Sequence, residues 1–409
     1  MRQTLLLFLF VQVFASASVG QNCPQYQTLI DKADAYWKNG AFENAISQLT
    51  AAREHCPARS NEIDKKIVDL VAEVSNKYRE AETEREKAMA AEQKAAAVLN
   101  KMYFYQDRFG LAYDRMGYGF IDKNLNVKIE FQYSEASPFD HTGYAKVKYG
   151  GDYYLIDTLG RQYSLATEVS QLSWEISALD LSQKELRELP DTVLKSIQLE
   201  ILLLSGNQLT SLPVQIGELK NLKILDLHEN QLSSLPPQIG ELKNLQTLYL
   251  HENQLSSLPE QIGELKNLQT LSVHSNQLTS LPAQIGELKN LQTLNLFSNK
   301  LTSLPPQIGE LKNLQLLYLY GNQLTNLLPE IGELKNLQSL RIGFKQLTSL
   351  PPQIGELKNL QSLYLYGIQL TSLPPQIGEL KNLQTLHIGS NQLTSLPPQI
   401  GELKNLQSL

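Results

Sequence analysis

The chain has 409 residues, of which 42% are apolar and 19% charged, and 36 basic against 42 acidic residues give a formal net charge of −6. At roughly 100–200 residues per domain, this length allows about two to four globular domains or one long repeat array. A mildly acidic chain without clusters of lysine and arginine is not expected to bind nucleic acid. Two cysteines exclude a disulfide-dense scaffold and a zinc site of four thiolates, and we expect no cofactor.

The amino terminus has the three parts of a secretory signal peptide. Residues 1–20 begin with Met1-Arg2, continue with an apolar run from Leu5 to Phe14, and end in small residues. Roughly ten apolar residues are too few for a membrane anchor, which needs about 20. No later run has membrane length. We therefore expect a mature chain without a membrane span, exported to the periplasm, the cell surface or the medium.

Residues 21–57 show the periodicity of two helices joined by a turn at Asn39-Gly40. Their small and aromatic residues resemble one tetratricopeptide unit, through Ala33, Tyr36, Gly40, Phe42, Ala45, Leu49, Ala52 and Pro57. In that family, small residues let two antiparallel helices pack closely. A single unit cannot bury its own face, so it needs a neighbour. We expect this hairpin to serve packing or capping rather than peptide binding.

Cys23 and Cys56 stand at the start of the first expected helix and at the end of the second. An antiparallel hairpin brings these ends together, so a disulfide is geometrically feasible in an oxidising compartment. Closing this loop would contribute roughly 3–4 kcal/mol in the chain-entropy description. The expectation depends on export.

Residues 58–102 are typical of one long helix, because Ile63, Ile67, Leu70 and Val74 form a single apolar stripe. Beyond Tyr78 the stripe decays to alanines among charged residues. A solvated spacer, about 60 Å long at 1.5 Å per residue, is favoured over a weak, alanine-rich coiled coil.

Residues 103–165 change to the chemistry of strands and turns, and they contain ten of the 18 tyrosines. The stretch Tyr-Gly-Phe-Ile-Asp-Lys at 118–123 resembles the core of bacterial WG-type β repeats, and a degenerate second start follows at 153–157. Tyr118 and Tyr153 stand where that family has tryptophan. The resemblance implies a small antiparallel β module without a catalytic role.

From Ile176 to Leu409 the sequence repeats every 23 residues, which makes ten repeats and four residues of an eleventh. The unit that begins at Leu245 reads LQTLYLHENQLSSLPEQIGELKN and resembles the leucine-rich repeat signature L-x-x-L-x-L-x-x-N-x-L. We number positions within each repeat from this first leucine. The resemblance implies an α/β solenoid: a horseshoe with a parallel concave sheet, preceded by the helical hairpin, the long helix and the β module.

Within each repeat, the leucines at positions four and six should point into the core, while position five points outward. Asparagine at position nine can bond backbone groups of the turn with its amide. This expected ladder consists of Asn207, Asn230, Asn253, Asn276, Asn299, Asn322 and Asn391, and it is broken by Lys184, Lys345 and Ile368.

Variety is concentrated at the outward positions of the expected strands, whereas the repeats are otherwise nearly identical. All five tyrosines of the array are at positions five or seven, and both phenylalanines are at seven or eight. Aromatic side chains exposed on a rigid sheet are common anchors of protein interfaces. The expected contacts are Tyr249, Phe297, Tyr318, Tyr320, Arg341, Phe344, Tyr364 and Tyr366, together with His228, His251 and His274.

The three histidines occupy position seven of adjacent repeats, about 4.8 Å apart. Two neighbours are able to share a zinc ion, but three in a line cannot converge well on one ion. We therefore expect no metal site, and a row that contacts solvent or a partner.

The sequence favours a non-enzymatic scaffold that binds a protein ligand on the concave face. The alternative is a surface- or glycan-binding adhesin that uses the same aromatic residues as stacking platforms. An enzyme such as a leucine-rich repeat ubiquitin ligase would need a catalytic cysteine, and Cys23 and Cys56 both belong to the expected hairpin. The sequence stops at Leu409 inside an expected strand, so self-association through this uncapped edge is a further expectation.

Overall fold

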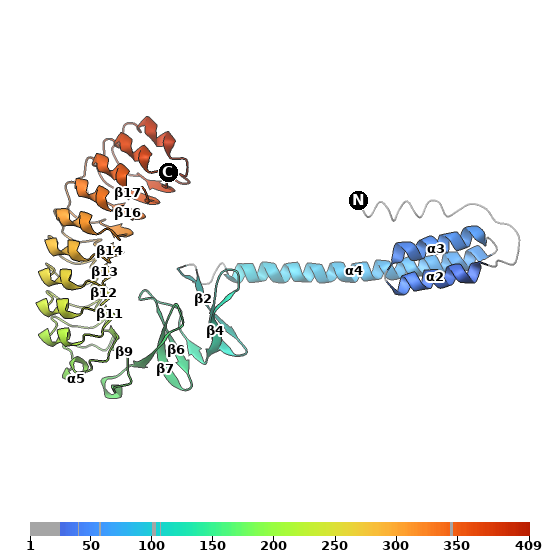
Figure 1. Ribbon diagram of the computed structural model, residues 1–409, viewed down its shortest axis with the longest axis horizontal. Helices are drawn as coiled ribbons and strands as arrows, with labels where there is room; N and C mark the ends of the chain where they lie inside the picture. The colour runs from blue at the N-terminus through green and yellow to red at the C-terminus, as the bar shows by residue number, and fades with distance from the viewer. Residues whose placement is uncertain (1–24, 40, 57–58, 100–103, 107, 344–346) are drawn as a thin grey trace. The chain divides into compact units, whose positions relative to one another are not determined.

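The computed structural model describes residues 25–39, 41–56, 59–99, 104–106, 108–343 and 347–409 (Figure 1). The chain divides into two compact units, residues 1–102 and 103–409, and each is described here by itself. The expected signal peptide and Cys23 lie outside the described residues, so export and the disulfide between Cys23 and Cys56 remain predictions.

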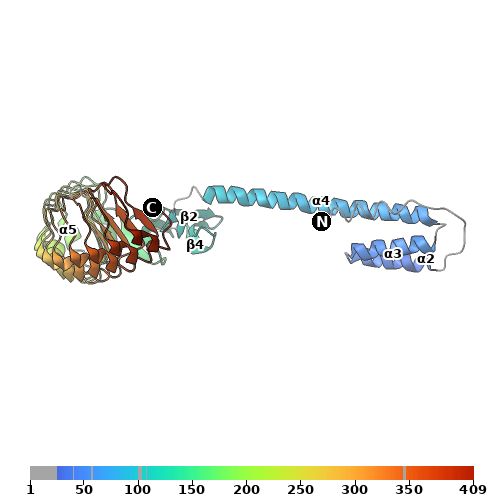
Figure 2. The ribbon, with the colours of Figure 1, turned by 90° about the horizontal axis from the view of Figure 1, so that it is seen from above.

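The described part of the amino-terminal unit consists of three helices: α2 (Tyr26–Lys38), α3 (Phe42–His55) and α4 (Ser60–Leu99) (Figure 2). The small residues expected at the helix contact are fully buried, Ala33 in α2 and Ala52 in α3. Ile63 of α4 packs into the same core. The helical hairpin and long helix are thus confirmed, and α4 provides the neighbour that the hairpin needs.

Ion pairs fasten the start of α4 to the hairpin. Lys66 Nζ lies 2.8 Å from Asp34 Oδ1 in α2, and Arg53 Nε in α3 lies 3.1 Å from Asp64 Oδ1 in α4. None of the described helices combines the length and apolar character needed to cross a membrane.

The segment that follows forms two groups of antiparallel strands. The first is β1 (Phe104–Tyr105), β2 (Phe109–Asp114), β3 (Gly117–Ile121) and β4 (Val127–Tyr133); the second is β5 (Glu135–Ala136), β6 (Tyr144–Tyr149), β7 (Asp152–Asp157) and β8 (Gln162–Ala166). Phe120, Tyr133 and Phe139 fill their common core. We call residues 104–166 the β module.

The aspartate of the WG-like motif closes a hairpin in each group. Asp122 Oδ1 accepts hydrogen bonds from the backbone N–H groups of Asn124 and Asn126, at 2.8 and 2.9 Å. Asp157 Oδ1 does the same for Leu159 and Arg161, at 2.9 and 3.0 Å. The repeated Ile-Asp pair is therefore explained by turn geometry, since a carboxylate can replace the missing strand partners.

The solenoid strands are short and parallel, in a register that advances by one repeat each time, as in Leu202↔Leu225 and Leu225↔Leu248. They are β9 (Ala178–Asp180), β10 (Ile201–Leu203), β11 (Ile224–Asp226), β12 (Thr247–Tyr249), β13 (Thr270–Ser272), β14 (Thr293–Asn295), β15 (Leu316–Tyr318), β16 (Ser339–Ile342), β17 (Ser362–Leu365) and β18 (Thr385–His387). They line the inner side of the curve in Figure 1. The expected leucine-rich repeat solenoid with a parallel concave sheet is confirmed.

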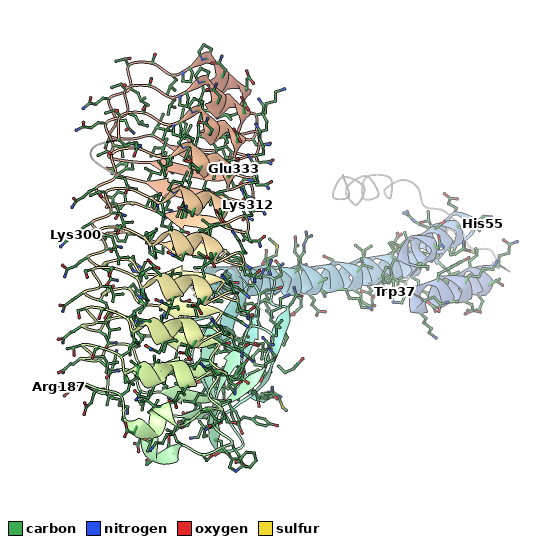
Figure 3. All side chains as sticks on the ribbon, turned by 60° about the vertical axis from the view of Figure 1, so that its left-hand side comes forward. Trp37, His55, Arg187, Lys300, Lys312 and Glu333 are labelled. Atoms are coloured by element: carbon green, nitrogen blue, oxygen red, sulfur yellow. The ribbon has the colours of Figure 1, made fainter. Side chains whose placement is uncertain are left out.

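The outer side of the solenoid consists of one helix, α5 (Asp191–Leu194), and then of 3-10 turns from η3 (Val214–Glu218) to η11 (Pro398–Glu402). The glycine of each turn permits close stacking: a Cβ on Gly240 would lie 2.5 Å from the carbonyl oxygen of Gln261 in the next repeat. Exposed lysine–glutamate pairs connect successive turns, as Lys312 Nζ does with Glu333 Oε2 at 2.9 Å (Figure 3). Solvent screens such pairs, so each contributes little to stability.

Inside the solenoid, the position-nine asparagines satisfy backbone groups that no strand reaches. Asn253 Nδ2 donates to the carbonyl oxygens of Leu227 and Leu250 at 2.9 and 3.1 Å, and Asn253 Oδ1 accepts from the N–H of Leu232 at 2.9 Å. The same pattern recurs at Asn207, Asn230, Asn276, Asn299, Asn322 and Asn391. Ile368, which breaks this ladder, is buried in the core instead; Lys345 lies outside the described residues.

The β module and the solenoid share one sheet, which the sequence did not predict. Strand β8 pairs in parallel with β9, through Leu165↔Ala178 and Ala166↔Leu179. The result is a 14-stranded sheet from β5 to β18. The first edge of the repeat array is therefore covered by a strand of the β module, because an open edge would leave backbone groups without partners.

The ladder predicts the effect of replacing one buried amide. Asn253→Ala would leave the N–H of Leu232 without its partner, while the carbonyl oxygens of Leu227 and Leu250 would each keep one hydrogen bond, from Asn230 and Asn276. We expect a loss of about 1–3 kcal/mol in unfolding free energy. Urea denaturation of the full chain measures this loss. The matched control is Gln254→Ala, at the exposed neighbouring position, for which a change within about 0.5 kcal/mol is expected. Equal effects of both changes would contradict the role of the ladder.

Candidate binding surface

The amino-terminal part of the concave face is covered by the chain itself. Ile201, Leu203 and Ile224 occupy outward positions of β10 and β11, yet they are only 1%, 7% and 4% exposed. They pack against Leu155 and Tyr163 of the β module. The sequence contained a sign of this coverage: these two repeats have isoleucine at position three, where later repeats have mostly threonine or serine.

The β module reaches farther along the face through the turn that carries His141. Its Nε2 lies 3.2 Å from Asp226 Oδ2, and its ring centroid lies 4.8 Å from that of His228. Tyr249 Oη donates a hydrogen bond of 2.9 Å to the backbone carbonyl of His141. His228 and Tyr249, which the sequence assigns to a partner, therefore have contacts within the chain.

Burial and charge set the titration of this region. Burial opposes ionisation of Asp226, but its hydrogen bonds with His141 and His228 outweigh this effect and lower its pKa to about 2. The hydrogen bond between Asp226 and His141 in turn raises the pKa of His141 above its ordinary value. Burial raises the pKa of Tyr249, which keeps its hydroxyl protonated and able to donate.

The three histidines of position seven form a stack. The His228 and His251 rings are 4.4 Å apart and nearly parallel, and so are those of His251 and His274 at 4.3 Å. Burial, together with the neighbouring histidines, lowers the pKa of His251 to about 3. This imidazole is therefore neutral at physiological pH, and the row is half-buried rather than solvated.

The carboxyl-terminal half of the face presents an exposed column at position five. The guanidinium carbon of Arg341 lies 5.1 Å from the ring centroid of Tyr318 and 4.6 Å from that of Tyr364. The ring of Tyr364 in turn stacks on His387 at 4.9 Å. Cation–π contacts of this kind hold an arginine in place while its polar edge stays free.

A second column runs along position seven. Phe297 and Tyr320 stack at 5.5 Å, and Phe297, Tyr320 and Tyr366 are 36%, 44% and 54% exposed. The ring of Tyr320 lies over Gly343, where any side chain would collide with it. Phe344 lies outside the described residues. We call the two columns the aromatic face: Phe297, Tyr318, Tyr320, Arg341, Tyr364, Tyr366 and His387.

Charge also separates the two halves of the concave side. The first eleven positions of the repeats that begin at residues 291, 314, 337, 360 and 383 contain no aspartate or glutamate. Their basic side chains are Lys300, Arg341, Lys345 and His387. In contrast, the same positions of the first four repeats contain Asp180, Glu185, Glu200, Asp226, Glu229 and Glu252. The aromatic face is thus cationic, and Arg341 has no carboxylate partner among the described residues.

Comparison with known families agrees with two of the three resemblances seen in the sequence, those to leucine-rich repeats and to WG-type repeats. A family described as leucine-rich repeat region matches residues 179–277, 244–349 and 328–409, which is more than half of the chain. A family described as WG containing repeat matches residues 118–153. No curated protein matches the sequence.

Several solved structures are similar to the chain. A leucine-rich repeat protein of Leptospira interrogans is 35% identical over 60% of this chain and 82% of that one, with a TM-score of 0.36. An internalin from Listeria monocytogenes is 21% identical over 59% and 76%, with a TM-score of 0.48. The Arabidopsis receptor kinase HAESA, in complex with a peptide hormone and a co-receptor, is 27% identical over 57% and 45%, with a TM-score of 0.49.

Substitutions at position five should affect stability strongly in the covered part of the concave face and weakly in its open part. Leu203→Asn places a polar group against the β module, and we expect it to lower the unfolding free energy by about 2–4 kcal/mol. Arg341→Asn changes an exposed side chain at position five, and it should alter the unfolding free energy by less than about 1 kcal/mol. Urea denaturation of the full chain compares the two. A silent Leu203→Asn would show that the β module does not cover this face.

Proposed function

Because this chain belongs to the leucine-rich repeat family, to which residues 179–409 correspond, we propose that it is a non-enzymatic scaffold that binds another protein through its concave face. The observation that carries the proposal is the aromatic face, in which exposed rings and one unpaired guanidinium lie on a rigid parallel sheet. The β module contacts the concave side as far as Tyr249 and His251, so the ligand is assigned to the repeats from residue 291 onward.

The physical properties of the aromatic face suit a protein ligand. Tyr320 and Tyr366 expose about half of their surface just beyond the ends of β15 and β17, which a continuous leucine core holds in place. Ordering such rings costs little entropy on binding, because each has few rotatable bonds, and the ring of Tyr320 already stacks on that of Phe297. Tyrosine and arginine are the side chains most enriched among interface residues that dominate affinity.

The charge of the aromatic face indicates which class of protein ligand it would bind. Arg341 stands between two tyrosine rings and has no carboxylate within the described part of the chain, so its guanidinium edge is free for a bidentate contact. Carboxylate groups are the natural partners of this edge. We therefore assign to the ligand an acidic segment with apolar side chains beside it.

The second candidate is a glycan-binding adhesin. Sugar rings stack on exposed tyrosine faces, and Tyr320 and Tyr366 offer two such faces. The arginine between the rings of position five favours the protein ligand, because a neutral glycan leaves that charge unpaired. Export, based on residues 1–20, places either ligand outside the cytoplasm in this proposal. Self-association through the edge beyond β18 is a separate proposal.

The proposed function is tested by affinity capture from an envelope extract of the source cell. The bait is the mature chain from residue 21, compared with a variant that has alanine at Tyr318, Tyr320, Tyr364 and Tyr366. We expect the variant to bind the captured protein more than about tenfold more weakly, because these rings form the centre of the contact. The matched control replaces Tyr113 and Tyr149, two exposed tyrosines of the β module, and should bind as the unchanged chain does.

The outcomes separate the candidates. Equal capture by all three baits would move the binding site away from the aromatic face and refute the proposal. Loss of capture in the presence of soluble polysaccharide, but not of protein extract, would favour the adhesin. A retained protein whose binding falls with rising salt would support the acidic segment, since screening weakens charge pairs.

A further inference from the structure

We propose that the His141 turn of the β module and the first concave repeats together form a binding site for a divalent transition-metal ion, with His141, Asp226 and His228 as ligands and Zn²⁺ as the ion. Nothing in the leucine-rich repeat or WG-type pattern carries such a site. It depends on the way in which this chain folds its β module over its own solenoid.

The three side chains converge from two parts of the chain that are 85 residues apart. One ligand atom from each residue lies within 4.8 Å of the other two. Asp226 Oδ1 is 2.7 Å from His228 Nδ1, and Asp226 Oδ2 is 3.2 Å from His141 Nε2. The Asp226 carboxylate therefore lies between the two imidazole nitrogens.

The donor set and its spacing suit zinc. Zn²⁺ binds imidazole nitrogen at about 2.0–2.1 Å and carboxylate oxygen at about 2.0–2.2 Å, which in a tetrahedral site separates the ligand atoms by roughly 3.3 Å. The separations in the structure bracket this value, so small rotations of the two imidazoles admit the ion. Two nitrogen donors and one oxygen donor match a borderline-soft ion better than Ca²⁺ or Mg²⁺, which prefer oxygen alone.

The ligands are held in place before any ion binds. The turn of His141 is fixed by Asp140, whose Oδ1 accepts from the N–H of Thr142 at 2.8 Å, and by the Tyr249 hydroxyl on the His141 carbonyl. Asp226 is 1% exposed, whereas Arg341 and His387, at the same position of later repeats, are exposed. Burying a carboxylate costs free energy unless a partner offsets its charge, and a bound metal cation would offset this charge more strongly than the two imidazoles alone.

A buried imidazole nitrogen lies beside the cluster. His251 Nδ1 is buried and has no hydrogen-bond partner among the described residues. Its ring stacks on that of His228 at 4.4 Å. A buried nitrogen without a partner is unusual in a folded protein and indicates a missing ligand or water. We assign the fourth coordination position to a water molecule, which His251 Nδ1 would hold.

From the sequence, we expect no metal site in the row of His228, His251 and His274. The three rings stack in parallel, at 4.4 and 4.3 Å. The proposed site uses only His228 from this row and takes its other two ligands from β11 and from the β module. A bound ion would fasten the β module to the solenoid, since it is coordinated by both.

The test is titration of the untagged full chain with Zn²⁺ alone, after treatment with a chelator and dialysis. Isothermal calorimetry should show one ion per chain, and Co²⁺ in its place should give the visible absorption of a nitrogen- and oxygen-ligated site. His141→Ala, Asp226→Asn and His228→Ala should each weaken binding by more than about tenfold. His387→Ala, which removes an exposed histidine of the aromatic face, is the matched control and should bind as the unchanged chain does.

His141→Ala is the decisive variant, because this side chain is 46% exposed on a turn and its removal leaves the core intact. Circular dichroism establishes that the variant is folded. Zn²⁺ should also raise the melting temperature of the unchanged chain but not that of this variant, since an ion that binds only the folded state stabilises it. Absence of Zn²⁺ binding by the unchanged chain, or equal binding by folded His141→Ala, would overturn the proposal.

Discussion

In the solenoid, the chain leaves each strand while its backbone is still surrounded by leucines, and the N–H and C=O groups at this point cannot reach water. The amide of the position-nine asparagine satisfies them, as Asn253 does for Leu227, Leu232 and Leu250. Since one side chain bonds two successive repeats, it also fixes the distance between them. The parallel register, the stacking of the outer turns at Gly240, and the alignment of outward side chains into columns all depend on this repeated bond.

The first strand of such an array exposes one sheet edge unless another strand covers it, and here the β module covers it. Pairing of β8 with β9 extends the sheet, and the β module then turns over the concave side, where Leu203 and Ile224 meet Tyr163. This arrangement divides the concave side into two regions. The first is closed and holds the Asp226 cluster, while the second remains available to a ligand.

The two regions differ in electrostatics for the same reason. In the covered region, water is excluded, so Asp226 retains its charge only through the two histidines that contact it. In the open region, solvent reaches Arg341, which stays unpaired between two tyrosine rings. A buried charge requires a fixed partner inside the molecule, whereas an exposed one is free to select a partner outside it. The metal site and the binding surface that we propose follow from this difference.

The repeat period by itself determined that Leu248 and Leu250 point inward, that Tyr249 points outward and that Asn253 bonds the turn, because these properties are local to one unit and are copied in the next. The same holds for the aromatic columns at positions five and seven. The hairpin, whose small residues Ala33 and Ala52 are buried, was predicted separately by the helical periodicity of residues 21–57. Only the tertiary structure decided that β8 joins the solenoid sheet and that His141 meets Asp226. No period relates the β module to the repeats, and a contact between residues 85 positions apart depends on how the whole chain folds back on itself. For that reason Tyr249 and Tyr364, which occupy the same position in the repeat, have different surroundings: one is held by the β module, and the other is open to a ligand.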